Sequence, residues 1–363
     1  MTRNRIRKLV TSRSALAGIL AIALGLAVIS FAAGRDGIDA DGTLHIKDLA
    51  VPLSSYLSPE ARSYLLHLLR DQPFAGGPSA TQDIKGYRAR QDEIMNGFLK
   101  PIRERYPVNV EHKTIAGLYT DVVTPQDGIA PRNRNRVLLN LHGGGFISGA
   151  RTAGLIESIP VAAVEKIKVV TIDYRMGPEY AFPAASEDVA GVYKEVLKEY
   201  PPDHVGLYGC SAGGMLAAMS IAWFQKVHLP NPSAIGVLCA SIGELTGGDA
   251  SYLTGPLNGF SAGPALFHPA YLSHVDPKDP LAYPIHSPAL VATFPPTLLV
   301  TSTRGMEYSS AIHSHNALVE AGVEADLHVW DGLPHAFWYN SDLPESREVY
   351  AVVARFFDRH FGK

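Results

Sequence analysis

Hydrophobic and polar positions change their spacing near residue 112 of the chain. Before it, two segments have helical periodicity, one beginning at Ser58 and Pro59 and a second covering roughly 82–105. Ser58 is a typical N-cap, and Pro59 suits the first helical position, where its missing N–H needs no partner. The apolar face of the first helix comprises Leu65, Leu66, Leu68 and Leu69. We therefore expect two helices ahead of any strand.

From residue 112 onwards, short apolar runs alternate with helical segments. Strands are expected at 117–125, 136–144, 169–175, 205–210, 235–241, 297–303 and 325–330, and the helices between them include 185–200, 212–226 and 310–321. This alternation is typical of the α/β class, with a mostly parallel central sheet flanked by helices on both faces. The segment 245–278 interrupts it with glycines and aromatic residues. An insertion at the carboxyl edge of a sheet is expected to form a lid or pocket wall.

The first 35 residues are expected to target the chain rather than to fold with it. A basic stretch precedes the run Ser14–Gly34, which carries no charge. The run fits an export signal cleaved after Ala32, but its length also approaches that of a membrane-spanning helix, so a retained anchor stays open. Because the basic flank stays inside, both alternatives export the globular part to the periplasm or the cell exterior, and the membrane is contacted only through such an anchor. Residues 36–57 are interpreted as a linker.

Charge and cysteine content exclude several classes of function. The 363 residues carry a net charge of −3, whereas a nucleic-acid partner requires a basic face that displaces counterions. Only two cysteines occur, Cys210 and Cys239, so neither a disulfide scaffold nor a thiolate zinc site is indicated, although a disulfide between them is left open. His313 and His315 are two residues apart and would point to different faces of a helix. We expect no nucleic acid, metal or cofactor.

The strongest chemical signal is G-x-S-x-G, formed by Gly209, Ser211 and Gly213 between an expected strand and an expected helix. Such a turn exposes the serine hydroxyl, and the flanking glycines are needed because side chains there would collide with neighbouring backbone. The turn also places the hydroxyl at a helix N-terminus, where the dipole favours developing negative charge. Ser211 is therefore the predicted nucleophile.

A second motif, from His142 to Phe146, is HGGGF at the end of an expected strand. Consecutive glycines allow the backbone to approach a ligand with its N–H groups directed into a site. Acyl transfer needs such donors because charge builds on the former carbonyl oxygen, and each preorganised N–H contributes about 3 kcal/mol there. We assign the amides of Gly144, Gly145 and Ala212 to an oxyanion hole.

His335 follows the last expected strand, within the stretch WDGLPHAFW. An imidazole with an ordinary pKa of about 6.5 can accept the serine proton and return it to the leaving group. The chain contains 14 histidines, and position selects His335, because α/β-hydrolases order their catalytic groups as serine, acid and histidine. It is the predicted general base.

Together these stretches resemble the hormone-sensitive-lipase-like family of α/β-hydrolases, in its bacterial esterase and acetyl-hydrolase branch with an HGGG loop. The segments DYRMGPEYAFPAASED (173–188) and DPLAYP (279–284) are similar to further elements of that family. The resemblance extends from about residue 58 to residue 361.

The resemblance implies an α/β-hydrolase domain over residues 111–363. It also implies a helical cap over the active site, built from 58–110 and from an insertion at about 245–278. Arg175 and Glu179, which lie in the segments that carry the resemblance, would have structural rather than catalytic roles near the site.

The comparison with that family exposes a gap, because the family usually carries an aspartate where this chain has Gly305. Glu307, two residues further along the same loop, could fill the role, since any suitably placed carboxylate can hold the histidine tautomer and stabilise the imidazolium. Alternatively, Glu244 or Asp249 could substitute from the loop after the preceding strand. Without any acid, the serine and histidine would work about 10⁴-fold more slowly or not at all. Glu307 is the predicted acid.

The residues and the resemblance together predict a serine carboxylesterase that hydrolyses small-molecule esters with short-to-medium acyl groups through an acyl-enzyme. Three aromatic residues, Phe146, Tyr252 and Phe260, are the expected substrate contacts. The alternative is a ligand-binding pseudo-hydrolase, because the plant gibberellin receptors resemble the same family and bind without turnover. The vacant acid position at Gly305 favours this alternative, whereas the retained serine, histidine and glycine loop favour the enzyme.

Overall fold

The computed structural model describes residues 38–46, 49–71, 80–260, 264 and 267–362. The chain divides into two units, Met1–Pro52 and Leu53–Lys363. The described part of the first unit contains an isolated antiparallel bridge between Ile38 and Leu44. The export segment predicted over 1–35 lies outside the described residues. Within the part of the chain that is described, no helix is both long and apolar enough to span a bilayer.

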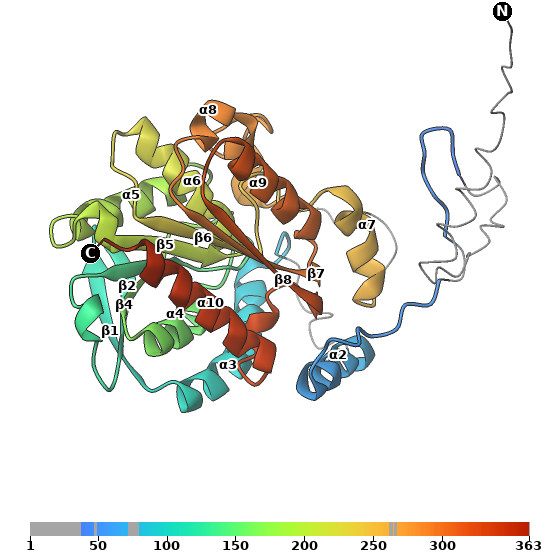
Figure 1. Cartoon of the computed structure of the whole chain (residues 1–363), viewed down its shortest axis with the longest axis horizontal. Helices are drawn as coiled ribbons and strands as arrows, with labels where there is room; N and C mark the ends of the chain where they lie inside the picture. Colours follow the sequence, from blue (N-terminus) through green and yellow to red (C-terminus); the bar gives the residue numbers. More distant parts are fainter. Residues whose placement is uncertain (1–37, 47–48, 72–79, 261–263, 265–266, 363) are drawn as a thin grey trace, which may run out of the picture. The chain divides into compact units, whose positions relative to one another are not determined.

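The second unit is built on an eight-stranded sheet. Its strands are β1 (Val108–Ile115), β2 (Leu118–Pro125), β3 (Val137–Leu141), β4 (Lys168–Ile172), β5 (Val205–Cys210), β6 (Ala234–Leu238), β7 (Thr297–Arg304) and β8 (Ala325–Pro334). They lie in the order β1-β2-β4-β3-β5-β6-β7-β8 (Figure 1). β2 runs antiparallel to both of its neighbours, β1 and β4, and every other neighbouring pair of these strands is parallel. The mostly parallel sheet predicted from the sequence is confirmed.

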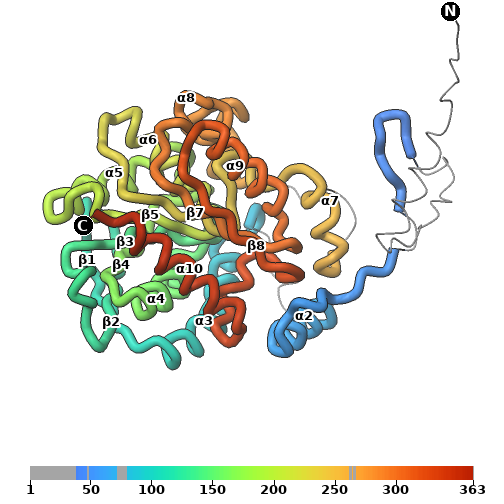
Figure 2. The backbone as a smooth tube through the Cα atoms, viewed as in Figure 1, coloured from blue at the N-terminus to red at the C-terminus, as the bar shows by residue number. Residues whose placement is uncertain are grey.

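Helices cover both faces of this sheet. The α-helices of the described residues are α2 (Pro59–Asp71), α3 (Ile84–Arg105), α4 (Thr152–Glu165), α5 (Ala184–Val196), α6 (Ala212–Lys226), α7 (Gly248–Leu257), α8 (Pro288–Val291), α9 (Tyr308–Glu320) and α10 (Pro344–His360). On one face, side chains of α5, α6 and α9 form a buried cluster with the sheet, and on the other face α4 and α10 form a second cluster. α4 also packs against both α3 and α10 (Figure 2).

Strand alternation explains the two clusters. Consecutive residues of a strand point to opposite faces, and in β3 the buried Leu139 belongs to the first cluster whereas its neighbour Leu138 belongs to the second. Because both faces are covered, the central strands are mostly apolar, and these short apolar runs are the signal that made them predictable.

The sequence prediction missed β1 and found the other seven strands. β1 begins at Val108, inside the range 58–110 that was assigned to the cap. It is an edge strand with a mostly exposed surface and the polar sequence VNVEHKTI, so it carries no continuous apolar run. At the start of α2, the amide of Ala61 donates to Ser58 Oγ at 3.0 Å, as expected for the predicted N-cap.

The ends of the parallel strands determine where chemistry can occur. Four predicted site positions follow strands directly or within three residues: Gly144 follows β3, Ser211 follows β5, Glu307 follows β7 and His335 follows β8. Parallel strands have their carboxyl ends at the same edge of a sheet, which is where open α/β sheets bind ligands. Residues far apart in sequence therefore meet at one edge.

Candidate active site

Ser211 occupies a sharp turn between β5 and α6. Its backbone has φ +56° and ψ −122°, a strained conformation for a residue with a side chain. The glycine two residues later allows the turn to close, because a Cβ atom at Gly213 would lie 2.6 Å from the carbonyl carbon of Leu141 and 2.7 Å from the carbonyl oxygen of His142. The strand, turn and helix that the G-x-S-x-G motif predicts are all present.

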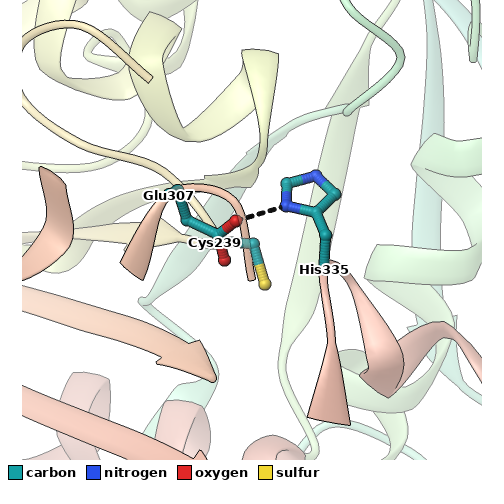
Figure 3. A group of neighbouring side chains, drawn as sticks. All are labelled: Cys239, Glu307 and His335. Atoms are coloured by element: carbon teal, nitrogen blue, oxygen red, sulfur yellow. Dashed lines mark hydrogen bonds and ion pairs between the residues drawn. The ribbon is translucent and has the colours of Figure 1, made fainter. Parts of the chain in front are cut away.

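The structure brings the predicted serine, histidine and glutamate together in one hydrogen-bonded chain. Ser211 Oγ and His335 Nε2 are 3.0 Å apart, and His335 Nδ1 lies 2.7 Å from Glu307 Oε2 (Figure 3). The second oxygen of Glu307 accepts a hydrogen bond from Thr301 Oγ1 at 3.0 Å. Glu307 is fully buried, whereas a quarter of the His335 side chain is exposed. The histidine can therefore reach both a cavity and a fixed carboxylate.

Of the three alternatives for the acid, the geometry supports Glu307. Position 305 is a glycine that follows the end of β7, and Glu307 is the N-cap residue immediately before α9. Glu244 pairs instead with His286, at 2.9 Å, and is half exposed. Asp249 is exposed in the first turn of α7. Neither alternative carboxylate contacts His335 in the described residues.

His335 and Glu307 each stabilise the charged form of the other. Burial disfavours the charged imidazole, but the charge of Glu307 and its hydrogen bond outweigh burial and raise the pKa of His335 to about 9. Burial disfavours the charged carboxylate as well, but the interaction with His335 outweighs it and lowers the pKa of Glu307 below its ordinary value. The pair thus stabilises an imidazolium, which is the species that forms when His335 takes a proton.

The glycine loop lies next to the serine. Gly144 and Gly145 have φ +121° and +66°, and a Cβ atom at Gly144 would lie 2.6 Å from the carbonyl carbon of Ser148. The amide of Gly143 donates to Glu157 Oε1 at 2.8 Å. Among the described residues, none accepts a hydrogen bond from the amides of Gly144, Gly145 or Ala212. These three predicted donors are therefore free to bind an oxyanion.

A cavity of about 510 Å³ opens above Ser211 and His335. Gly144 and Gly145 line it, and so do side chains from both predicted cap segments. The cap residues include Tyr64, Leu65, Leu68 and Leu69 of α2, Tyr87, Met95 and Phe98 of α3, and Thr254, Asn258 and Phe260 of the later segment. Most of these side chains are apolar, so the cavity suits an apolar group attached to a polar reacting centre.

Two of the three expected substrate contacts do not line the cavity. Phe146 is fully buried below the loop, where its ring stacks on Tyr271 at a centroid distance of 4.8 Å. Its backbone, at φ +61°, follows the glycine turn and directs the ring into the core. Tyr252 is 60% exposed on α7 and does not line the cavity. Phe260 does line it.

Residues 58–110 were expected to form a cap over the active site, but none of the α2 and α3 side chains was named as a substrate contact. Their apolar periodicity was visible, but the same pattern describes a helix that packs on a core. Leu65 has both roles, since it is 1% exposed and also lines the cavity. Arg175 and Glu179 are held in ion pairs, Arg175 with Asp188 at 2.8 Å and Glu179 with Arg88 at 2.7 Å.

Cys239 lies beside the histidine and glutamate (Figure 3). Its sulfur and the ligand atoms of Glu307 and His335 all lie within 4.8 Å of one another, so the three groups could in principle hold a metal ion. An ion bound by both partners in tetrahedral geometry would hold the nitrogen and oxygen about 3.4 Å apart. They are 2.7 Å apart, which fits a direct hydrogen bond and would have to change for an ion to enter. Cys239 and Cys210 are both free and buried.

Comparison with known proteins agrees with the fold and the site. Residues 138–339 match the family described as alpha/beta hydrolase fold, and the chain belongs to that family. An acetyl-hydrolase of Streptomyces hygroscopicus is 30% identical over 230 residues, which cover 62% of this chain and 76% of the relative. The crystal structure of an esterase, E25, has a TM-score of 0.75 and 27% identity, covering 88% of this chain and 99% of its own. An esterase from the bacterial hormone-sensitive lipase family has a TM-score of 0.71 and 26% identity, covering 84% and 99%.

These similarities confirm the resemblance to the hormone-sensitive-lipase-like esterases. They support serine esterase function, and hence carboxylic ester hydrolase activity, at the level of the family. The natural ester and the roles of individual residues are matters for the proposal that follows.

Proposed function

We propose that this protein is a serine carboxylesterase in which Ser211 is the nucleophile, His335 the general base and acid, and Glu307 the residue that orients the histidine. The observation that carries the proposal is the unbroken hydrogen-bonded chain from Ser211 Oγ through the imidazole to Glu307, with distances of 3.0 and 2.7 Å, at the base of a cavity.

In the first half of the proposed reaction, His335 Nε2 takes the proton of Ser211 Oγ as that oxygen attacks the ester carbonyl carbon. The carbonyl oxygen becomes an oxyanion and accepts hydrogen bonds from the amides of Gly144, Gly145 and Ala212. The bond to the alcohol oxygen then breaks, and His335 donates its proton to the departing alcohol. The acyl group remains on the serine.

In the second half, a water molecule replaces the alcohol. His335 takes a proton from the water as its oxygen attacks the acyl-enzyme, and a second oxyanion forms in the same set of amides. Collapse of this species releases the carboxylic acid and returns the proton to Ser211 Oγ. Glu307 keeps its negative charge throughout and stabilises the imidazolium in both halves.

The cavity supports small esters with an apolar group as substrates. A volume of about 510 Å³ lies in the range of sites that bind small molecules. Its apolar walls from α2 and α3 favour a short-to-medium acyl chain or an apolar alcohol, and offer few partners to a highly polar sugar. The relative named as an acetyl-hydrolase is in keeping with a short acyl group.

The pseudo-hydrolase alternative was motivated by the vacant acid position. Since Glu307 lies within hydrogen-bond distance of His335, the missing aspartate at Gly305 no longer favours a chain without turnover. We retain the esterase as the proposed function.

Hydrolysis of p-nitrophenyl acetate, butyrate, octanoate and laurate by the purified chain tests the proposal, with Ser211→Ala as the matched variant. We expect hydrolysis that falls at the longest chain and is lost by a factor of at least about 10³ in the alanine variant. Equal rates for the two proteins would overturn the esterase proposal.

We also propose that the chain is exported. The support is the basic stretch followed by the uncharged run Ser14–Gly34. Fractionation of cells that express the full chain or a chain without residues 2–35 tests this. Export of only the full chain is the expected result, and equal cytoplasmic retention of both would contradict it.

A further inference from the structure

A second buried carboxylate, Glu157, lies behind the active site. It belongs to α4 and is fully buried. Its Oε1 accepts hydrogen bonds from the amide of Gly143, at 2.8 Å, and from the hydroxyl of Tyr339. Its Oε2 accepts from Asn140 Nδ2 at 2.8 Å. The proposed reaction uses none of these contacts, so the charge has no assigned purpose.

Two of the partners of Glu157, Gly143 and Tyr339, come from the two loops that carry the chemistry. Gly143 opens the glycine loop after β3, immediately before the oxyanion donors Gly144 and Gly145. Tyr339 closes a short 3₁₀ helix (Phe337–Tyr339) that begins two residues after His335. One carboxylate oxygen therefore accepts hydrogen bonds from the oxyanion loop and from the histidine loop at once.

Close packing at this junction depends on Gly143. A Cβ atom there would lie 2.8 Å from the hydroxyl oxygen of Tyr339 and 3.4 Å from Glu157 Oε1. The hydroxyl, the carboxylate and the loop backbone thus leave no room for a side chain. A rigid contact of this kind transmits the position of one loop to the other.

We propose that Glu157 is a positioning residue that fixes the oxyanion loop relative to His335 by accepting hydrogen bonds from Gly143 and Tyr339 through one oxygen. This inference rests on the proposed esterase function. The amides of Gly144 and Gly145 stabilise an oxyanion only if they point to one place before charge develops. Both residues have positive φ values, which the backbone of glycine can leave easily, so the loop needs an external restraint.

The chemistry of a carboxylate suits this task. An ionised carboxylate only accepts hydrogen bonds and can satisfy several donors at once, and here it has three donors from three segments. Burial raises the pKa of Glu157 to about 7, against the hydrogen bonds from Tyr339, Asn140 and Gly143, which favour the charged form. A well-packed apolar residue would avoid this cost of burial. Stability alone therefore does not explain a glutamate here, whereas positioning does.

Three variants test the proposal. Glu157→Leu removes the acceptor and keeps most of the volume, Glu157→Gln keeps one acceptor oxygen, and Tyr339→Phe removes only the hydroxyl. The matched control is Glu165→Leu, because Glu165 lies on the same helix, is 3% exposed and bonds Asn133 and Arg132. The measurements are kcat and KM for p-nitrophenyl butyrate, together with the Tm of each protein.

For Glu157→Leu we expect kcat to fall about 100-fold, as when one oxyanion donor is lost, with KM changed less than threefold. Glu157→Gln should recover kcat to within tenfold of the wild type, and Tyr339→Phe should lower kcat about tenfold. Since both contacts act through one oxygen, the double variant Glu157→Leu/Tyr339→Phe should be no slower than Glu157→Leu alone. Glu165→Leu should keep kcat within twofold, although its Tm falls.

Several results would overturn the inference. One is a kcat for Glu157→Leu within twofold of the wild type; another is an equal loss of kcat in Glu165→Leu. If Glu157→Leu does not fold, the Gln and Phe variants decide, and a Tyr339→Phe protein with wild-type kcat would refute the link. If hydrolysis does not depend on Ser211, the proposed esterase function itself is refuted. If hydrolysis depends on Ser211 but the Glu157 variants have wild-type kcat, only the positioning role of Glu157 is refuted.

Discussion

A Cβ atom at Gly305 would lie 2.8 Å from the carboxyl carbon of Glu307 and 2.9 Å from its Oε2. The glutamate therefore occupies the space that a side chain at position 305 would need. A side chain at position 305 would force the carboxylate of Glu307 out of its present position, so the glycine lets that carboxylate stay within hydrogen-bond distance of His335. Under the proposed assignment, the acid lies two residues further along the chain than in the pattern of the family.

An exchange of the two positions tests this relocation. Gly305→Asp alone should lower both Tm and kcat, because the new side chain collides with a buried carboxylate and adds a like charge beside it. Combining it with Glu307→Ala should recover kcat to well above that of Glu307→Ala alone. Steady-state kinetics and thermal melts of the three variants measure the effect. A Gly305→Asp protein with wild-type kcat and Tm would contradict the argument.

Removal of the charge of Glu307 should slow the chemistry. Glu307→Gln keeps the shape of the side chain but can stabilise the wrong histidine tautomer, and the equivalent change in the serine-protease triad costs about 10⁴-fold in kcat. We expect a loss of about 10³ to 10⁴ with p-nitrophenyl butyrate, and little change in KM. A loss of only a few-fold would show that Glu307 does not orient His335.

The same variant should shift the pH dependence of activity. Only the neutral imidazole can accept the serine proton, and the charge of Glu307 raises the pKa of His335 to about 9, against burial. The kcat/KM of the wild type should therefore rise with pH towards that value. In Glu307→Gln the charge is gone and burial remains, so the rise should occur at lower pH. Profiles that coincide would contradict this account.

The pair of His335 and Glu307 should also make the stability of the protein depend on pH. The raised pKa of His335 contributes stability below the ordinary histidine value of about 6.5, and this contribution is lost as pH rises through about 9. The lowered pKa of Glu307 contributes stability above its ordinary value of 4.5, and this is lost as pH falls through the lower value. Both contributions are fully present between pH values of about 4.5 and 6.5, the two ordinary pKa values. The Tm difference between the wild type and Glu307→Gln should therefore be largest in this range, and it should shrink at higher and at lower pH. Thermal melts of both proteins across pH check this, and a constant difference would contradict it.

The residues that could be predicted from the sequence are those whose position immediately after a strand is set by a local motif or by the order along the chain. Ser211 and His335 could be found because the elbow motif and the order along the chain do not depend on distant packing. Glu307 could be proposed only because one carboxylate stood close to a vacant position, and the spacing alone left Glu244 and Asp249 open. The choice depends on how β7 and α9 meet, which is a matter of tertiary structure.

Other features could not be predicted from the sequence, for physical reasons. The edge strand β1 has polar residues on an exposed surface, so it lacked the apolar run that marked the central strands. Phe146 was expected to contact the substrate, but the positive φ values of the loop turn its ring into the core. An apolar helix face such as that of α2 looks the same whether it covers a core or a cavity.

The glycine loop offers a prediction with an internal control. Gly144→Ala should lower kcat by at least about 100-fold, because its Cβ would lie 2.6 Å from the carbonyl carbon of Ser148 and must displace an oxyanion donor. Gly128 also has a positive φ, +96°, but has no described atom within 4 Å of a Cβ. Gly128→Ala should keep kcat and lose about 1 kcal/mol of stability from backbone strain. Equal kinetic effects of the two substitutions would show that strain, rather than the collision, governs the loss.

Arg88 attaches the cap helix α3 to the loops around the site. Its Nε donates to the carbonyl oxygen of Ile147 at 2.7 Å, and its Nη2 donates to that of Gly177 at 2.9 Å. The same guanidinium pairs with Glu179 through both terminal nitrogens at 2.7 Å. A lysine has no planar fork and cannot make all of these contacts. In Arg88→Lys, α3 should therefore be less firmly held, and Tyr87 beside it lines the substrate cavity.

We expect Arg88→Lys to raise KM about tenfold, the equivalent of one lost hydrogen bond of about 1.4 kcal/mol, and to change kcat less. The matched control is Arg103→Lys on the same helix, since Arg103 is exposed and does not line the substrate cavity. Exchange of one exposed basic residue for another changes the free energy by at most about 1 kcal/mol, so the KM of this control should stay within twofold of the wild type. A larger fall in kcat than rise in KM for Arg88→Lys would mean that Arg88 acts on the glycine loop through Ile147 rather than on the cap. An unchanged KM and kcat would mean that the attachment of α3 does not shape the substrate site.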